Sequence, residues 1–535
     1  MLMQDTTDFS PAHWRRSLIA ALVCGTLVSI PVLSAAASTH GKAEHIVVVV
    51  WDGMRPDFVS AQHTPNLDQL RRQGVFFNRH HPVFVSTTEV NGSALATGMY
   101  PDHTGILANK LYRPELNWLE AAATENLEII RRGDLLSHGH YLFSPTLAEI
   151  LQKAGERTIV AGTKPVVLLL DRSNQRGSLA ERGSVNLFQG HSLPASALAD
   201  IVATDGEQFP TNVTYPNVKE DAWTTKSLTE SLWKTGVPKL SFLWLSDPDF
   251  SQHDSGPGST KSLAALESSD RNLGAVLAAL DAKNVRDKTD VFVVSDHGFS
   301  TINYAPDIAL ILRHAGFRAT RKLSDPEAGE VLVVGLGGSD LFYVVDHDET
   351  VVRRLTEFLQ TTDFAGVIFS RTKLPGTFPL EQIRSEATYA PDLLVALRWS
   401  PEKSATGAPG MITSDAGKVG KGTHGSLSPY DMHNTLVGAG PDLRPGFVDE
   451  SPSGNADLAP TILWILGIAQ PKPMDGRILG EALRTGVFSA PTARSQTVEA
   501  KNESTAIHWR QHLTFTTIGH SIYFDEGNGE ATSPH

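Results

Sequence analysis

Three strongly apolar runs in this chain are each followed closely by an aspartate. They read HIVVVVWD, LSFLWLSDPD and VFVVSDHG, and the aspartates are Asp52, Asp249 and Asp296. Each run is short and almost continuously apolar, as expected of a parallel strand that is buried on both faces. Ligand sites in open α/β sheets lie beyond the carboxyl ends of the strands. We therefore expect three carboxylates at one edge of one sheet.

The rest of the chain alternates apolar runs with helical patterns, which predicts an α/β fold. We expect a three-layer α/β/α sandwich with a mainly parallel sheet over residues 42–488. Residues of about 302–420 are richer in glycine and turns, and we interpret them as an inserted cap lobe. The alternative is that this block simply continues the core sheet. Residues 489–535 form a polar C-terminal tail, with a terminal hairpin as one possibility.

The N-terminal segment has the pattern of a cleaved export signal over residues 1–37. The pair Arg15 and Arg16 precedes an apolar stretch, and three consecutive alanines follow it. The stretch is short and interrupted for a membrane span, although an uncleaved anchor is the alternative. The sole cysteine, Cys24, falls inside this segment, so the mature chain would contain no disulfide. The pattern predicts a periplasmic or secreted protein without a stable membrane anchor.

Composition excludes some partners. The chain has 535 residues, 41% of them hydrophobic, and a formal net charge of -13. This is the composition of a globular protein with ample material for a core. The acidic balance and the lack of a long Lys/Arg block argue against binding to a nucleic-acid duplex. Nothing in the sequence indicates the oligomeric state.

Three histidines stand close to the aspartates or to glycines: His253, His297 and His424. Imidazole and carboxylate together suit zinc or a similar divalent ion. Six such ligands are enough for two ions with three protein ligands each, which leaves open positions for a substrate. That arrangement is typical of a two-metal hydrolase.

Thr88 sits just before a helix-like stretch that runs to Thr97. A hydroxyl at a helix N-terminus lies beside free backbone N–H groups, which can hold a phosphate oxygen. Threonine is a weak nucleophile, and a bound dication would activate it. The alternative is that Thr88 is an ordinary helix cap.

Five motifs occur in a fixed order: WDGMRPD, TTEVN followed by ATGMYPDHTGI, DPDFSQHDSGPG, SDHG and GTHG. Each is weak alone, but the ordered set resembles the nucleotide pyrophosphatase/phosphodiesterase branch of the alkaline phosphatase superfamily. The resemblance covers residues of about 45–480. It implies an alkaline-phosphatase-like fold and a metal-dependent hydrolase of small phosphoric esters, most simply a phosphodiesterase.

The resemblance also implies a role for individual residues. Thr88 would be the nucleophile and form a phospho-threonine intermediate, and Asn109 would hold a phosphoryl oxygen. The implied ligands of two divalent ions, zinc in the family, are Asp249, His253 and His424 for one ion, and Asp52, Asp296 and His297, with the Thr88 hydroxyl, for the other.

Three further positions bear on the substrate. Nucleotide-cleaving relatives place an aromatic residue after the nucleophile, where this chain has Glu89. Trp244 falls where relatives carry a stacking tyrosine, and Lys164 where some phosphomonoesterases place a lysine that contacts phosphate. We expect a diester with a polar or amine group. A phosphomonoesterase or phosphonate hydrolase is the close alternative, and a secreted binding protein on a degenerate scaffold is a remote one.

Overall fold

The computed structural model describes residues 40–172, 183–486, 488–504 and 508–531. The predicted export signal lies outside these described residues. None of the described helices is long and apolar enough to cross a membrane.

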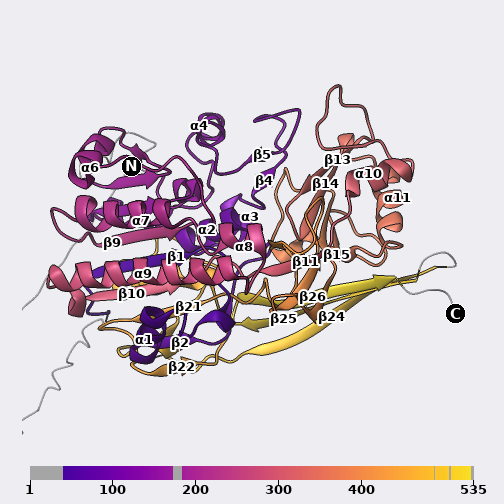
Figure 1. Cartoon of the computed structure of the whole chain (residues 1–535). Coiled ribbons are helices and arrows are strands. Elements are labelled where there is room, and N and C mark those ends of the chain that lie inside the picture. The colour runs from indigo at the N-terminus through magenta and orange to yellow at the C-terminus, as the bar shows by residue number, and fades with distance from the viewer. Residues whose placement is uncertain (1–39, 173–182, 487, 505–507, 532–535) are drawn as a thin grey trace, which may run out of the picture. The chain divides into compact units, whose positions relative to one another are not determined.

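A nine-stranded sheet forms the centre of the fold, with the order β22-β2-β21-β10-β1-β9-β6-β7-β8 (Figure 1). The neighbours β10, β1, β9, β6 and β7 are parallel, whereas β21 and β8 pair antiparallel with their neighbours. The strands span His45–Trp51 (β1), Val75–Phe77 (β2), Thr158–Gly162 (β6), Val185–Phe188 (β7), His191–Leu193 (β8), Leu240–Leu245 (β9), Thr289–Val294 (β10), Leu436–Ala439 (β21) and Phe447–Asp449 (β22). The sheet is therefore mainly parallel, as the apolar runs predict.

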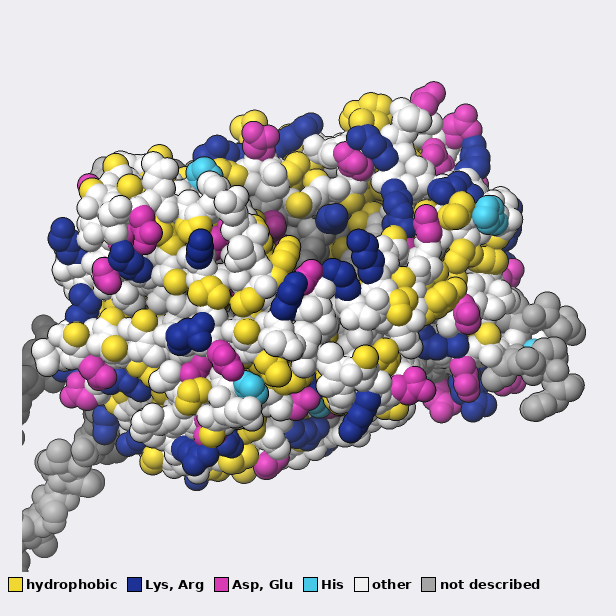
Figure 2. Space-filling model, viewed as in Figure 1, with side chains coloured by type: hydrophobic (Ala, Val, Ile, Leu, Met, Phe, Trp, Pro, Cys, Tyr) yellow, Lys and Arg dark blue, Asp and Glu magenta, His cyan; other side chains and the backbone are white. Residues whose placement is uncertain are grey.

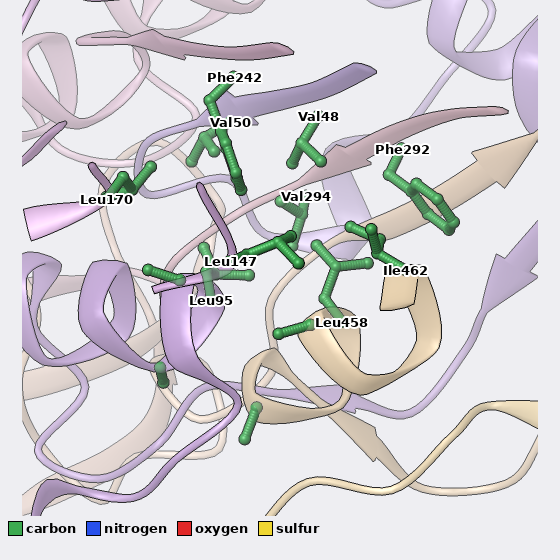
Figure 3. Packing of buried hydrophobic residues seen from close by; sticks show 14 of the residues in the cluster. Val48, Val50, Leu95, Leu147, Leu170, Phe242, Phe292, Val294, Leu458 and Ile462 are labelled. Carbon is green, nitrogen blue, oxygen red and sulfur yellow. The ribbon is translucent and has the colours of Figure 1, made fainter. Parts of the chain in front are cut away.

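Alternate residues of β1 pack into two separate cores. Val48 and Val50 belong to a cluster that includes Leu95, Leu147 and Leu458 from three helices (Figure 3). On the other face, Val47 and Val49 pack with side chains of helices α1, α7 and α9. The helices are Pro65–Gln73 (α1), Thr88–Thr97 (α2), Leu147–Lys153 (α5), Val218–Lys226 (α7), Thr260–Ala282 (α9) and Leu458–Ile465 (α12). This arrangement gives the predicted three layers.

Several shorter elements accompany these strands and helices. They are His80–His81 (β3), Pro101–Thr104 (α3), Lys110–Leu111 (β4), Ala122–Ala123 (β5), Leu127–Leu136 (α4), Ala197–Asp205 (α6), Asp249–Ser255 (α8) and Ser453–Gly454 (β23).

The segment expected as an inserted lobe contains a second sheet with the order β12-β13-β14-β17-β15-β16. Its strands span Ala319–Thr320 (β12), Val331–Gly335 (β13), Ser339–Val344 (β14), Ala365–Ser370 (β15), Phe378–Pro379 (β16) and Leu393–Leu397 (β17), and its helices Ile308–His314 (α10) and Glu349–Leu359 (α11). Side chains of both helices pack on one face of this sheet. A four-stranded sheet consists of Ser300–Tyr304 (β11), Trp399–Lys403 (β18), Pro409–Thr413 (β19) and Gly422–Thr423 (β20).

The predicted polar tail contains three long antiparallel strands, Arg494–Glu503 (β24), His508–Ile518 (β25) and Ser521–Ala531 (β26). Leu513, Phe515 and Phe524 are buried and pack with residues of the second sheet. The Gln511 side chain bonds to the backbone N–H and carbonyl of Ile368 in β15. These strands lie beside the second sheet in Figure 1.

Candidate metal centre

The three predicted aspartates meet because their strands are neighbours. β1 lies between β9 and β10, with parallel pairing on both sides. Asp52 directly follows β1, and its carbonyl accepts a hydrogen bond of 2.9 Å from the Asp249 backbone N–H. Gly53 N–H donates to Asp296 Oδ1 at 3.0 Å. The carboxyl ends of three adjacent strands therefore bring the three side chains to one edge of the sheet.

One group of potential ligands surrounds Asp249. Its Oδ1 lies 3.3 Å from His253 Nε2 and 3.6 Å from His424 Nε2. His253 is one helical turn further along α8, so the helix itself sets this spacing. His424 follows the short strand β20 and is buried, whereas the His253 side chain is 42% exposed.

The second group surrounds His297. Its Nε2 lies 3.5 Å from Asp52 Oδ1 and 3.2 Å from Asp296 Oδ2. The hydroxyl of Thr88 is 3.3 Å from the same nitrogen. All four residues are buried. The two groups adjoin, because the His297 and His424 rings stack at 3.6 Å between centroids, and Asp249, His297 and His424 also form a close triad of possible ligands.

The hydrogen bonds of the three histidines fix which ring nitrogen can bind a cation. Nδ1 lies near a backbone carbonyl in each: Gly422 for His253 at 3.1 Å, Gly298 for His297 at 2.9 Å, and Ser86 for His424 at 2.9 Å. A carbonyl only accepts, so Nδ1 carries the proton and Nε2 presents a lone pair. All three lone pairs therefore belong to the nitrogens that face the carboxylates.

The carboxylate oxygens that face these nitrogens are also suited to bind a metal ion. Asp52 Oδ1, Asp249 Oδ1 and Asp296 Oδ2 are buried and have no hydrogen-bond partner among the described residues. Two ligands of one tetrahedral zinc lie about 3.3 Å apart at ordinary bond lengths. The observed separations of 3.2–3.6 Å between nitrogen and oxygen match this value. Unpaired oxygens opposite unprotonated nitrogens are what divalent cations would satisfy.

The electrostatics agree with this arrangement. Burial, and then the neighbouring Asp296, hold the pKa of Asp52 well above its usual range. Burial raises the pKa of Asp296 to about 6 and lowers that of His424 to about 3. Carboxylates crowded in a buried site repel one another, and neutral imidazole is the form that ligates metals.

Two predicted substrate residues contact the ligands instead. Asp52 Oδ2 accepts hydrogen bonds of 2.8 Å from Trp244 Nε1 and from Lys164 Nζ, and Lys164 Nζ also lies 3.1 Å from Asp249 Oδ2. Trp244 is fully buried in β9, as expected of a tryptophan in a core strand. The ammonium group of Lys164 is paired with the carboxylates of Asp52 and Asp249. Both side chains leave Oδ1 of each aspartate free for a cation.

The start of α2 carries the remaining predicted residues. Thr88 is its first residue, and Asn109 Oδ1 accepts a 3.1 Å hydrogen bond from the Glu89 backbone N–H. This bond turns the Asn109 amide NH₂ group away from that N–H, where it can donate to another group. The Glu89 side chain is buried, and burial followed by the charge of Glu125 raises its pKa well above the usual range. Glu125 is not identified by the sequence analysis, because it lies in a loop and belongs to no motif.

A separate cavity of about 720 Å³ lies between the segment that follows β4 and the second sheet. Figure 2 shows a hollow on this face, with Lys and Arg side chains around it. Its lining includes Tyr112, Arg113, Tyr343, Arg371 and Tyr389 but none of the predicted metal ligands.

Comparisons with known proteins identify a family and several relatives of this chain. The family model described as Type I phosphodiesterase / nucleotide pyrophosphatase matches residues 46–426. The chain is 23% identical over 287 residues to rat ectonucleotide pyrophosphatase/phosphodiesterase family member 7, covering 53% of this chain and 56% of the relative. It is 21% identical to bis(5'-adenosyl)-triphosphatase enpp4 of Xenopus laevis over 53% of this chain and 52% of the relative.

The mouse bis(5'-adenosyl)-triphosphatase enpp4 is 20% identical over 82% of this chain and 81% of its own length. In the first two alignments, by contrast, the chain spans about half the length of the curated relatives that it matches. The family model itself covers well over half of this chain. The chain therefore belongs to the type I phosphodiesterase / nucleotide pyrophosphatase family.

Proposed function

We propose that this chain hydrolyses phosphodiesters, with Thr88 as the nucleophile and two zinc ions held by the six aspartate and histidine side chains. One observation carries the proposal: three imidazole Nε2 atoms face buried, unpaired carboxylate oxygens beside a threonine at a helix start. Family membership supports hydrolysis of phosphoric diesters.

Bound ions would stabilise phosphoryl charge as Lewis acids and lower the pKa of the Thr88 hydroxyl and of water. The chain's own part is to place Thr88 Oγ1 at the first residue of α2, where free backbone N–H groups can hold a phosphoryl oxygen. Asn109 would donate its amide N–H to the same phosphoryl group. Thr88 Oγ1 would lose its proton to solvent and attack phosphorus as the ester bond to the leaving oxygen breaks, and the leaving oxygen would take up a proton from water. Water would then attack phosphorus and break the bond to Oγ1, which regains a proton.

The surroundings of Lys164 favour a diester over a monoester. A monoester carries an additional negative charge, which phosphomonoesterases meet with extra cationic groups. Here the Lys164 ammonium group is bound to Asp52 and Asp249, and its pKa is raised by Asp249 and Asp52 in spite of burial. Two residues later the chain has Val166, which is fully buried and apolar.

The test compares hydrolysis of bis(p-nitrophenyl) phosphate and p-nitrophenyl phosphate by the purified protein with zinc. We expect the diester to be preferred, and Thr88→Ala to lower its kcat by about a thousandfold or more. Thr87→Val is the matched control, because Thr87 precedes α2 and its buried hydroxyl has no hydrogen-bond partner among the described residues. A preference for the monoester would contradict the proposal, as would full activity of Thr88→Ala. Bound zinc without any activity would point to a binding protein.

We further propose that the preferred diester carries a polar or amine group near Glu89. Glu89 follows Thr88 in α2, its carboxyl group lies close to that of Glu125, and burial raises the pKa of both. An ammonium group there would pair with a carboxylate and favour its ionised form. A nucleobase would find no aromatic partner at this position.

Glu89→Phe tests this preference, with Glu89→Gln as the control for loss of charge alone. We expect Glu89→Phe to raise the activity on p-nitrophenyl thymidine 5'-phosphate, relative to bis(p-nitrophenyl) phosphate, by about tenfold through stacking. Both variants should lose activity on p-nitrophenyl phosphorylcholine. An unchanged ratio in Glu89→Phe would refute the placement of Glu89 beside the polar or amine group of the diester.

Export from the cytoplasm remains part of the proposal, and it rests on the leader pattern of residues 1–37.

A further inference from the structure

A second kind of histidine–carboxylate cluster lies apart from the proposed catalytic centre. His81 comes from β3, His433 from the segment before β21, and Asp525 from β26. Asp525 Oδ1 lies 3.2 Å from His81 Nε2 and 3.8 Å from His433 Nε2. The three potential ligand atoms are all within 4.8 Å of one another. Segments that are remote in the sequence therefore converge on one point.

Neither neutral tautomer of the His81 ring can donate a hydrogen bond at both of its nitrogens. Nδ1 is 3.1 Å from the Ser453 carbonyl, and Nε2 is 3.2 Å from Asp525 Oδ1. Neutral imidazole has a single N–H, so one lone pair must face an acceptor oxygen. Protonation would satisfy both, but burial lowers the pKa of His81. A cation between Nε2 and Oδ1 satisfies both without protonation.

His433 supplies an independent sign of a missing partner. Its Nε2 atom is buried yet has no hydrogen-bond partner among the described residues, although the side chain as a whole is 36% exposed. The His433 ring meets that of His81 edge-on at 4.6 Å between centroids. Its Nε2 therefore points to the same Asp525 oxygen without reaching hydrogen-bond distance.

The other groups around Asp525 leave room for an ion. Oδ2 accepts a 3.0 Å hydrogen bond from Thr516, so Oδ1 is the oxygen available as a ligand. Arg79 Nη2 donates a hydrogen bond of 3.4 Å to Oδ1 and forms an ion pair with it, but the Arg79 side chain is 37% exposed and can turn into solvent when an ion binds. Separations of 3.2 and 3.8 Å bracket the value of about 3.3 Å between two ligands of a tetrahedral zinc.

We propose that His81, His433 and Asp525 bind a further divalent transition-metal ion of the zinc class. The donor set of two imidazoles and one carboxylate suits such an ion, with water in the remaining position. The ion links β26 of the C-terminal sheet to β3 and to the segment before β21. Its role is structural, because none of the three ligands belongs to the proposed catalytic groups.

Zinc content of the full chain tests the site. The probe is zinc alone, measured by mass spectrometry of metals after equilibration at a fixed free concentration, for the wild type and His433→Ala. We expect the variant to bind about one zinc fewer per chain, with hydrolysis of bis(p-nitrophenyl) phosphate changed by less than about threefold. His512→Ala is the matched control, because His512 is on the same C-terminal sheet, is 37% exposed and pairs with a carboxylate, Glu526.

The difference between the wild type and the variant is independent of the catalytic proposal. If the catalytic groups held no zinc, both counts would fall but the difference of one would remain. Asp525→Asn, which keeps the shape of the side chain, is a second variant and should also lose that zinc. Added zinc should raise the melting temperature more in the wild type than in either variant. Equal zinc contents in the wild type and both variants would overturn the site.

Discussion

The nine-stranded sheet and the six-stranded sheet both bury aspartates completely, but they treat them differently. At the carboxyl edge of the first sheet, Asp52 and Asp296 face the Nε2 atom of His297. In the second sheet, Asp340 on β14 is equally buried, and both of its oxygens lack partners among the described residues. No described histidine joins it in a potential metal group.

The charge balance of the two sheets differs as well. Asp415, the neighbour of Asp340, is bound by Arg321 through two contacts of 2.7 and 2.8 Å. Burial and then Asp415 raise the pKa of Asp340 well above its usual range, which favours the neutral acid. A buried carboxyl therefore indicates a metal site only where lone pairs of other ligands oppose it. Where such ligands are absent, protonating the buried carboxylate costs less free energy than keeping it charged.

The largest effect should come from removing a histidine at the first sheet. His424→Ala deletes a neutral imidazole that faces Asp249 Oδ1 and should lower kcat/KM for bis(p-nitrophenyl) phosphate by about a thousandfold or more. Zinc content measured on the same preparation should fall. His314→Ala, an exposed histidine of α10 in the second lobe, is the control and should change neither quantity. Activity retained in His424→Ala would exclude His424 as an essential ligand.

A smaller effect should follow from removing a hydrogen bond that supports a predicted metal ligand. Trp244→Phe removes the indole N–H that donates to Asp52 Oδ2 at 2.8 Å. Loss of such a supporting hydrogen bond typically lowers metal affinity or activity by about 10- to 100-fold. Kinetics at limiting zinc should show this loss, together with recovery at higher zinc.

Trp233→Phe is a close control for Trp244→Phe. Trp233 is also fully buried, and its Nε1 donates to Ser241 Oγ at 3.0 Å, but it touches none of the predicted ligands. Both variants should lower thermal stability to a similar degree, because each removes a buried indole. If Trp233→Phe lost as much activity as Trp244→Phe, the effect would reflect packing and not support of Asp52.

The sequence predicts a site residue only when the pattern that marks it lies close to it along the chain. Apolar runs with a following aspartate predicted the strand ends of Asp52, Asp249 and Asp296, because strand and residue lie together in the sequence. His424 is separated from His297 by the whole segment that contains the second sheet, so only the motif resemblance placed it. The same strand-end rule applied to β6 could have placed Lys164 beside the aspartates, because β6 pairs with β9.

Other contacts had no signal in the sequence. The Trp244 indole appears in an apolar run, where a buried tryptophan and a pocket wall look alike, and only the register between β1 and β9 brings it to Asp52. His81, His433 and Asp525 come together through packing of the C-terminal sheet, which has no local pattern. Glu125 reaches Glu89 from a loop for the same reason. Convergence of remote segments is a property of packing, and no single segment records it.

The smallest effect should come from the second sheet, and it should be one of stability. Asp340→Asn replaces a buried acid by a neutral amide of nearly the same shape. Because the folded pKa of Asp340 is raised, its contribution to stability is fully present below the pKa of the unfolded chain, about 4, and is lost as pH rises towards the folded value. The amide does not titrate, so the variant should gain stability relative to the wild type at pH 8 and little at pH 4.5. The gain is about 1.4 kcal/mol for each pH unit over which the folded protein keeps a proton that the unfolded chain has lost. Melting temperatures at the two pH values measure this, with the exposed Asp325→Asn as the control. An equal difference at both pH values would show that Asp340 is already ionised in the folded protein, and the two sheets would then differ in their ligands alone and not in how they carry buried charge.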